Sequence, residues 1–193
     1  MVDTSKATRA FFRTNKQTCN DWFCRIRFNM INVSMRSGNY ETTVRHSFEY
    51  LSYFASHNYQ PNQDFELVVI CLTRALVKLE AWQSLEGLHK YLSQTFKKLN
   101  FEWIKSSIEE AKGSLEMAAD SYKRGFRKSY STTLTTNVAK YECDRVFDCY
   151  FRLHDWESFM DWHSEYKSIY EKIDSESLRQ QFEMSKYELN YVK

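Results

Sequence analysis

Residues 11–27 have the sequence FFRTNKQTCNDWFCRIR, which carries the pattern of a helix that begins. Thr14 followed three residues later by Gln17 fits a capping box, in which each side chain bonds a backbone N–H that the first turn leaves unpaired. Apolar residues then recur at steps of three and four, as Cys19, Trp22, Phe23, Ile26, Met30 and Val33. We therefore predict a first helix over about residues 15–36 whose aromatic face packs on a partner.

Residues that interrupt helices are scarce in this chain of 193 residues. There is one proline, Pro61, and there are four glycines, Gly38, Gly87, Gly113 and Gly125. All-β domains need frequent turn residues and flexible linkers need glycine, so both are disfavoured. Aromatic residues make up 17 % of the chain and supply large side chains for helix contacts. The composition predicts an all-α fold with an aromatic core.

Periodic apolar residues and turn residues divide the rest of the chain into further helices. The residue before Pro61 is disfavoured in a helix, and Asn62 or Asp64 is expected to cap the helix that follows. The Ser/Thr-rich residues 129–136 have weak periodicity and are predicted to form a loop. The predicted helices cover residues 40–57, 65–79, 82–99, 115–126, 138–153, 156–170 and 177–191.

The openings of these helices recur along the chain. Tyr40, Trp82, Lys112 and Trp156 each follow or occupy a short turn, at intervals of 42, 30 and 44 residues. Two openings share four residue types at one spacing: Leu79, Trp82, Ser84 and His89, then Leu153, Trp156, Ser158 and His163. Helix-pair repeats have periods of about 34 to 47 residues. We predict stacked antiparallel helical hairpins, a degenerate tetratricopeptide/HEAT-like α-solenoid, in a single segment over residues 1–193.

The cysteines and the hydropathy of the chain indicate the cellular compartment of the protein. The five cysteines include no CxxC pair, and no spacing typical of a metal site involves them or the histidines, so no metal is predicted. They are expected to be reduced thiols of an intracellular protein without a secretory leader. The longest aliphatic run, residues 67–72, is too short to span a bilayer. We expect a cytoplasmic protein, with the nucleus as a further location and no membrane contact.

Catalytic patterns are weak. A kinase needs a Gly-rich loop, a lysine on the phosphates and an aspartate on magnesium, and the sequence shows no such set, so we predict no catalysis by this chain. His154 and Asp155 form the nearest candidate pair, but adjacent residues point to different faces of a helix. Glu109 and Glu110 are predicted to be solvated helix charges.

One cluster of cations could have a binding function. Lys123, Arg124, Arg127 and Lys128 lie within six residues at a predicted helix end. Cations at a helix C-terminus gain about 0.3 to 1 kcal/mol each from the macrodipole, which is one explanation of the cluster. The other is a polyanion site, since several cations can converge on phosphates.

The charge of the two ends differs. Residues 141–193 contain 7 Lys and Arg against 12 Asp and Glu, whereas the first 27 residues are basic. However, Arg25 and Arg27 flank Ile26 on a helix predicted to be packed, and no RNA-binding signature is present. Direct binding of nucleic acid is therefore not expected.

The sequence also resembles a known family. The pattern FFRTN…TC.DWF.RIR in residues 11–27, the turn at residues 35–38 and Val44-Arg45-His46 are similar to the helical FAT region of the phosphatidylinositol 3-kinase-related protein kinases, most of all those of nonsense-mediated mRNA decay. The specific part of the resemblance covers about residues 11–60. Beyond residue 60 it is one of architecture.

The resemblance implies a function for a larger protein. That protein would be a serine/threonine kinase that phosphorylates an RNA helicase during mRNA surveillance, with this segment as a scaffold that positions the kinase domain and binds its partners. The resemblance also implies inositol hexakisphosphate as a ligand of a basic pocket, for which the cluster at residues 123–128 is the candidate.

A free-standing helical-repeat adaptor, which binds a protein in its groove, is the alternative. An exposed apolar face on the predicted helix 177–191, with Phe182, Leu189 and Val192, would favour a fragment of a longer protein, because solenoids need polar caps.

Overall fold

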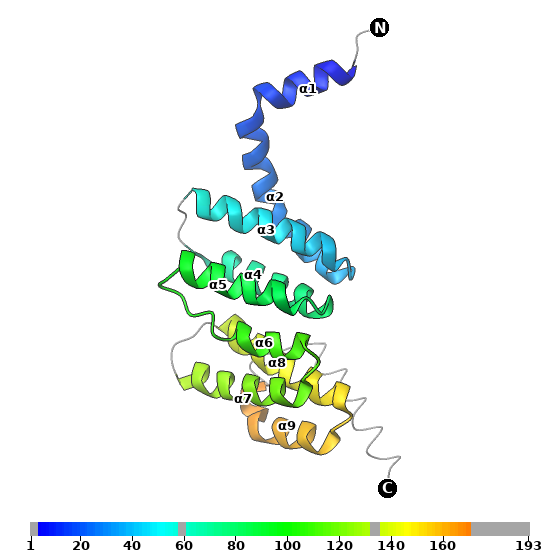
Figure 1. Ribbon diagram of the computed structural model, residues 1–193, viewed down its shortest axis with the longest axis vertical. Helices are drawn as coiled ribbons and strands as arrows, with labels where there is room; N and C mark the ends of the chain where they lie inside the picture. Colours follow the sequence, from blue (N-terminus) through cyan, green and yellow to red (C-terminus); the bar gives the residue numbers. More distant parts are fainter. Residues whose placement is uncertain (1–3, 58–60, 132–135, 171–193) are drawn as a thin grey trace. The chain divides into compact units, whose positions relative to one another are not determined.

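The computed structural model describes residues 4–57, 61–131 and 136–170, and all regular secondary structure in these ranges is α-helical (Figure 1). The predicted all-α fold of helical hairpins is confirmed. The helices are α1 (Thr4–Thr14), α2 (Lys16–Arg36), α3 (Tyr40–Ser56), α4 (Gln63–Lys78), α5 (Trp82–Thr95), α6 (Ile104–Ala111), α7 (Leu115–Ser131), α8 (Thr136–Leu153) and α9 (Trp156–Tyr170).

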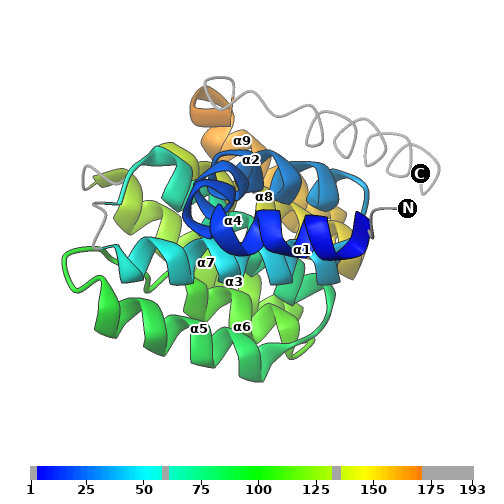
Figure 2. The same ribbon diagram turned by 90° about the horizontal axis from the view of Figure 1, so that it is seen from above.

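The chain forms two compact units, residues 1–75 and 76–193, and the boundary falls inside α4. In the first unit, α2 packs along α3. In the second unit, α5, α6, α7 and α8 each contact the next helix in sequence, up to α9. The contact between α7 and α8 is the most extensive, and the two helices lie side by side (Figures 1 and 2). Each unit is thus built from helices that pack on their sequence neighbours.

The first unit has a small mixed core. Ile31 and Leu51 are fully buried between α2 and α3, and the hydroxyls of the buried Ser34 and Thr43 lie 2.8 Å apart across the same interface. The Phe54 ring on α3 lies 5.0 Å from the Phe65 ring on α4. At the start of α4, Asn62 Oδ1 accepts a bond from the backbone N–H of Phe65 at 2.9 Å, which confirms the predicted cap.

The core of the second unit is aromatic, as predicted. Phe126 of α7 and Phe147 of α8 both pack against Trp162 of α9, with ring centroids 5.7 and 6.3 Å apart. Phe159 adds a further edge contact to Phe147 at 4.9 Å. All four rings are at most 2 % exposed, so the three helices are joined by large buried surfaces.

One type of turn ends α2, α4, α6 and α8. In each, a residue of positive φ donates its N–H to the carbonyl three residues back, and the next N–H bonds the carbonyl five residues back, which is the Schellman motif. The residues of positive φ lie 42, 33 and 41 positions apart and are Gly38, Glu80, Gly113 and His154. The structure therefore contains a repeating unit, in which one such turn joins two helices.

The residue after each of these positions opens the next helix. Asn39 Oδ1 accepts from the N–H of Thr42 at 3.2 Å, and Asp155 Oδ1 accepts from the N–H of Ser158 at 3.0 Å. Such short reversals place consecutive helices antiparallel. The pair His154 and Asp155 thus belongs to a turn and a helix cap.

The structure corrects the start of α2. α1 was not predicted, because residues 4–10 contain few apolar residues and show no stripe. The residue before α2 is Asn15, and its amide donates back to the carbonyl of Phe11 at 3.0 Å. The predicted capping box at Thr14 is therefore wrong, since Thr14 is the last residue of α1.

Other boundaries also differ. α5 ends at Thr95 and not at residue 99, because the last buried side chain of its stripe is Leu92 and Leu99 is 42 % exposed. α6 was missed because eight residues give too short a periodic pattern. Residues 129–131 are helical although a loop was predicted there. The predicted helix 177–191, with Phe182, Leu189 and Val192, lies outside the described residues.

The predicted aromatic face of α2 is not packed. We call Cys19, Trp22, Phe23, Ile26, Met30 and Val33 the α2 stripe. Trp22 is 56 %, Phe23 40 % and Val33 66 % exposed, while the other three are half-buried. α3 instead packs against the adjoining side of α2, where Ile31 and Ser34 lie.

Candidate functional site

The second unit contains a buried carboxylate held by three helices. Glu110 of α6 is 2 % exposed. Its Oε2 accepts from Arg145 Nε of α8 and from the hydroxyl of Tyr122 of α7, both at 3.0 Å. Its Oε1 accepts from Arg145 Nη2 and, at 3.1 Å, from Arg152 Nη1. Every helix of the α6–α7–α8 group thus contributes to one charged centre.

A chain of hydroxyls extends this centre. The buried Ser107 of α6 lies 2.8 Å from the hydroxyls of both Tyr122 and Tyr141. Burial raises the pKa of both tyrosines, and for Tyr122 the neighbouring Tyr141 and Glu110 raise the pKa further. Both hydroxyls therefore keep their protons and act as hydrogen-bond donors and acceptors at neutral pH.

The ion pairs of the centre reinforce one another. Burial alone would lower the pKa of Arg145, but the charges of Glu110 and Asp148 outweigh it and raise that pKa well above its ordinary value. For Asp148, burial alone would raise the pKa, but the charges of Arg145, Lys78 and other cations outweigh it and hold that pKa below its ordinary value. Arg145 and Asp148 are therefore both charged near neutral pH.

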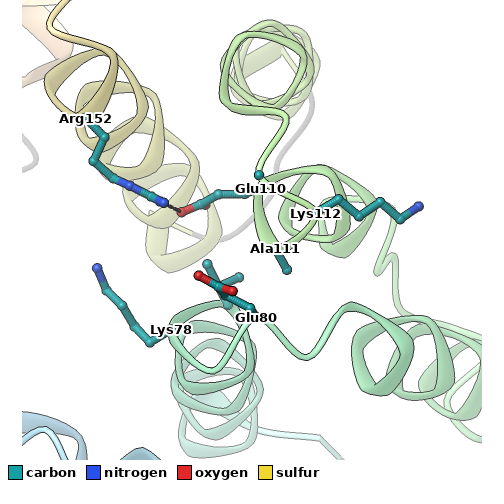
Figure 3. Close-up of a pocket in the computed structure, with 8 residues that line it drawn as sticks. Lys78, Glu80, Glu110, Ala111, Lys112 and Arg152 are labelled. Carbon is teal, nitrogen blue, oxygen red and sulfur yellow. Dashed lines mark hydrogen bonds and ion pairs between the residues drawn. The ribbon is translucent and has the colours of Figure 1, made fainter.

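A pocket of about 250 Å³ adjoins this centre. It is lined by the C-terminal ends of α4, α6 and α8, and its charged residues are Lys78, Glu80, Glu110, Lys112 and Arg152 (Figure 3). Arg152 points to Glu110, whereas Lys112 extends away from the other charged side chains. Lys112 lies 3.5 Å from both Glu86 and Glu109.

The chemistry of the pocket is limited by this pairing. Arg152 pairs with Glu110 and Lys112 pairs with Glu86 and Glu109, and Glu110 already accepts bonds on both oxygens. In residues 4–57, 61–131 and 136–170, no group of three or more His, Cys, Asp or Glu side chains could hold a metal ion. The arrangement fixes three helices against one another and shows no nucleophile with an adjacent base.

Comparison with known proteins places the chain in a family. The family described as "Serine/threonine-protein kinase smg-1" matches residues 1–193, which is the whole chain. The chain belongs to the SMG1 family. No solved structure matches it significantly.

The SMG1 relatives are far longer than this chain. A serine/threonine-protein kinase SMG1 of Danio rerio is 27 % identical over 228 residues, covering 97 % of this chain and 6 % of the relative. The Smg1 kinase of Drosophila melanogaster is 24 % identical over 157 residues, covering 81 % of this chain and 5 % of the relative. A probable smg1 kinase of Dictyostelium discoideum is 29 % identical over 86 residues, 42 % of this chain.

The predicted polyanion residues all lie on α7. Lys123 is half-buried, with its Nζ 5.2 Å from the Tyr150 ring centroid and 3.5 Å from Asp120 Oδ1. Burial lowers the pKa of Lys123, but Tyr150 and Asp120 together outweigh it and raise the pKa. Lys123 is thus engaged with α8, while Arg124, Arg127 and Lys128 are exposed.

The buried centre corrects the interpretation of Glu110. The sequence predicted Glu109 and Glu110 to be solvated, and this is wrong for Glu110, which faces α8. The two neighbours look alike in sequence, and the partner Arg145 is 35 residues away. No sequence signal marked Glu110, because α6 itself was not predicted and its buried face could not be assigned without it.

Two histidines have single carboxylate partners. His46 Nδ1 lies 3.6 Å from Glu49 Oε2, and His89 Nε2 lies 3.5 Å from Glu102 Oε1.

None of the helices in the described part of the chain has the length and hydropathy of a membrane-spanning helix.

Proposed function

We propose that the chain is a non-catalytic scaffold segment of a serine/threonine kinase of the SMG1 family, within its FAT region. The observation that carries the proposal is the match of all 193 residues to the family together with a coverage of only 6 % of the Danio rerio relative. In this proposal residues 1–193 form one helical-repeat segment that contacts the rest of the kinase and its protein partners in the cytoplasm, and also in the nucleus. The catalytic step of the larger kinase, phosphorylation of an RNA helicase during mRNA surveillance, takes place outside this segment.

Stiffness is the property through which such a segment acts. A scaffold positions another domain only if its own helices keep a fixed register. The Glu110 centre ties α6, α7 and α8, and the Phe126, Phe147 and Trp162 rings tie α7, α8 and α9. Buried polar groups of this kind specify one arrangement of helices, because any shift leaves a buried charge without its partner.

The proposal predicts that damage to the core lowers kinase activity although no core residue touches a substrate. In the full-length kinase, Phe126→Ala removes a fully buried ring from the second unit. We expect it to reduce kcat toward a protein substrate several-fold while KM for ATP changes less than twofold. The matched control is Phe48→Ala, since Phe48 is 39 % exposed on α3.

Two results would contradict the scaffold role. One is unchanged kcat in Phe126→Ala when the same preparation shows a lowered unfolding temperature. The other is a native polypeptide of about this chain's own mass, 23.2 kDa, on an immunoblot. That second result would favour the free-standing helical-repeat adaptor.

A ligand of the FAT region is also part of the proposal. Arg124, Arg127 and Lys128 are exposed, and positions three and four apart are neighbours on a helix surface. With Lys123 beside them, they supply four cations on α7. Their proposed ligand is inositol hexakisphosphate, whose phosphates suit guanidinium forks and lysine ammonium groups.

A further inference from the structure

The α2 stripe is an apolar face of a helix that is partly exposed to solvent. Trp22 and Val33 are more than half exposed, and Ile26 and Met30 lie half-buried between them along α2. The stripe runs for about four helical turns, since each turn takes 3.6 residues. Large exposed apolar surfaces with a regular geometry mark interaction sites.

The geometry of the stripe favours a helix over a nucleic acid. The residues of the stripe recur mostly at steps of three and four, which forms a ridge that fits the groove of another helix. Ile26, Met30 and Val33 are aliphatic and offer no stacking platform. The two rings, Trp22 and Phe23, pack edge-to-face on each other, with centroids 5.2 Å apart and planes at 70°. Single-stranded nucleic acid needs open aromatic faces for its bases.

Charge defines the flanks of the partner. Residues 4–36 contain seven Lys and Arg against one acid, Asp21, a net charge of +6. Within the unit, Arg27 pairs with Glu49 at 3.0 Å. Arg9, Arg13, Lys16 and Arg36 are exposed along α1 and α2. An acidic partner is favoured here, because complementary charges steer association.

The length of the relatives indicates where the partner comes from. The chain covers 6 % and 5 % of two SMG1 kinases, so most of the length of such a polypeptide lies outside this segment. In the second unit, successive helices pack on one another from α5 to α9. We propose that the α2 stripe is the seat of another helix of the same kinase polypeptide, one with an apolar face flanked by acidic residues. This inference rests on the proposed function.

Photo-crosslinking in the full-length kinase tests the inference. p-Benzoylphenylalanine is placed at position 22 in one variant, at position 33 in a second, and at Ser52, an exposed residue of α3, as the matched control. We expect positions 22 and 33 to crosslink within one polypeptide, to the same acidic amphipathic segment outside residues 1–193. The control should not reach that segment.

The other occupants give different products. Two differently tagged copies joined in one band would show a second copy of the chain, and a labelled nucleotide adduct would show RNA. The inference would be overturned by either of these products. It would also be overturned by a crosslink only to another protein, or by no crosslink from positions 22 and 33.

Charge reversal provides a second measurement. The double variant Arg13→Glu and Lys16→Glu should lower the crosslink yield from position 22 at least threefold at low salt, and less at high salt, because salt screens exposed charges. An unchanged yield would refute the acidic flanks.

These outcomes separate the inference from the scaffold role. If Phe126→Ala lowers kcat while position 33 forms no internal crosslink, only the partner helix is wrong. If the native polypeptide has the mass of this chain alone, both proposals fail.

Discussion

Two glycines inside helices show how residue environment decides the effect of one methyl group. A Cβ added at Gly87 of α5 meets no atom within 4 Å, whereas a Cβ at Gly125 of α7 overlaps Glu142 Oε1. Glu142 is fully buried on α8, so its carboxylate has no room to move into solvent. Gly125 therefore permits the close approach of α7 and α8.

The same substitution should have opposite effects at these two sites. Gly87→Ala should stabilise the protein by about 1 kcal/mol, the difference in helix propensity between alanine and glycine. Gly125→Ala has the same intrinsic gain but overpacks a core interface, which costs about 1 to 3 kcal/mol, so a net loss is expected. Urea unfolding curves of both variants provide the test, and a more stable Gly125→Ala would contradict the packing.

Glu109 and Glu110 form a second matched pair. Glu110→Ala leaves the buried Arg145 without its main partner, and breaking a buried pair costs about 3 to 5 kcal/mol. Glu109 is half-buried and lies 3.5 Å from the exposed Lys112, so Glu109→Ala should cost less than about 1 kcal/mol. The free energy of unfolding of each variant is the measurement that tests this difference. Similar losses in both would refute a special role for Glu110.

At the scale of elements, the four Schellman turns differ in the residue type that adopts positive φ. Glycine occupies positions 38 and 113, but Glu80 and His154 also adopt positive φ. A left-handed conformation costs a residue with a Cβ roughly 1 to 2 kcal/mol relative to glycine. The repeats therefore contain stored local strain in the α4–α5 and α8–α9 turns.

Replacing Glu80 by glycine should relieve that strain. We expect Glu80→Gly to raise the stability of the second unit by about 1 kcal/mol, although glycine also makes the unfolded chain more flexible. The reverse change, Gly113→Ala, should lower stability by a similar amount. Thermal unfolding of both variants is the measurement, and a shift of both in one direction would exclude this explanation.

The cations of α7 make a prediction about ligand binding. If they hold inositol hexakisphosphate, micromolar ligand should raise the unfolding temperature of the protein, and the double variant Arg124→Ala and Arg127→Ala should remove most of that rise. Lys90→Ala on α5, another exposed cation, serves as the control. An equal rise in all three proteins would place the ligand elsewhere, and no rise in any would exclude it.

At the scale of the whole molecule, two cysteines report on the integrity of the second unit. Cys143 and Cys149 are fully buried on α8, and burial raises the pKa of each thiol to about 12. The thiolate is the reactive form, so both thiols are protonated and inert at pH 8.

Alkylation should therefore follow unfolding. With iodoacetamide at pH 8, we expect Cys143 and Cys149 to react only as fast as the second unit opens, and Phe126→Ala should speed their reaction together. Peptide mass spectrometry over time distinguishes the sites. Rapid labelling of native protein at either site would show that α8 is not packed as described.

Local signals in the sequence were sufficient for much of the architecture. The all-α class, the turn before Tyr40, the cap at Asn62 and the apolar faces of α7 and α8 each depend on residues within a few positions of one another. Helical periodicity and helix breakers act over that same short range, which is why they could be recognised. The family resemblance of residues 11–60 was likewise visible without coordinates and agrees with the SMG1 family match.

Only the tertiary structure decided which charges are buried and which rings are exposed. Glu110 and Glu109 are equivalent in sequence, but Arg145 arrives from a helix 35 residues away and selects one of them. In the same way, the α2 stripe has the pattern of a buried face, yet α3 packs on the adjoining side. Burial depends on the direction from which a neighbouring helix approaches, and that direction is a property of the folded chain and not of any short stretch of it.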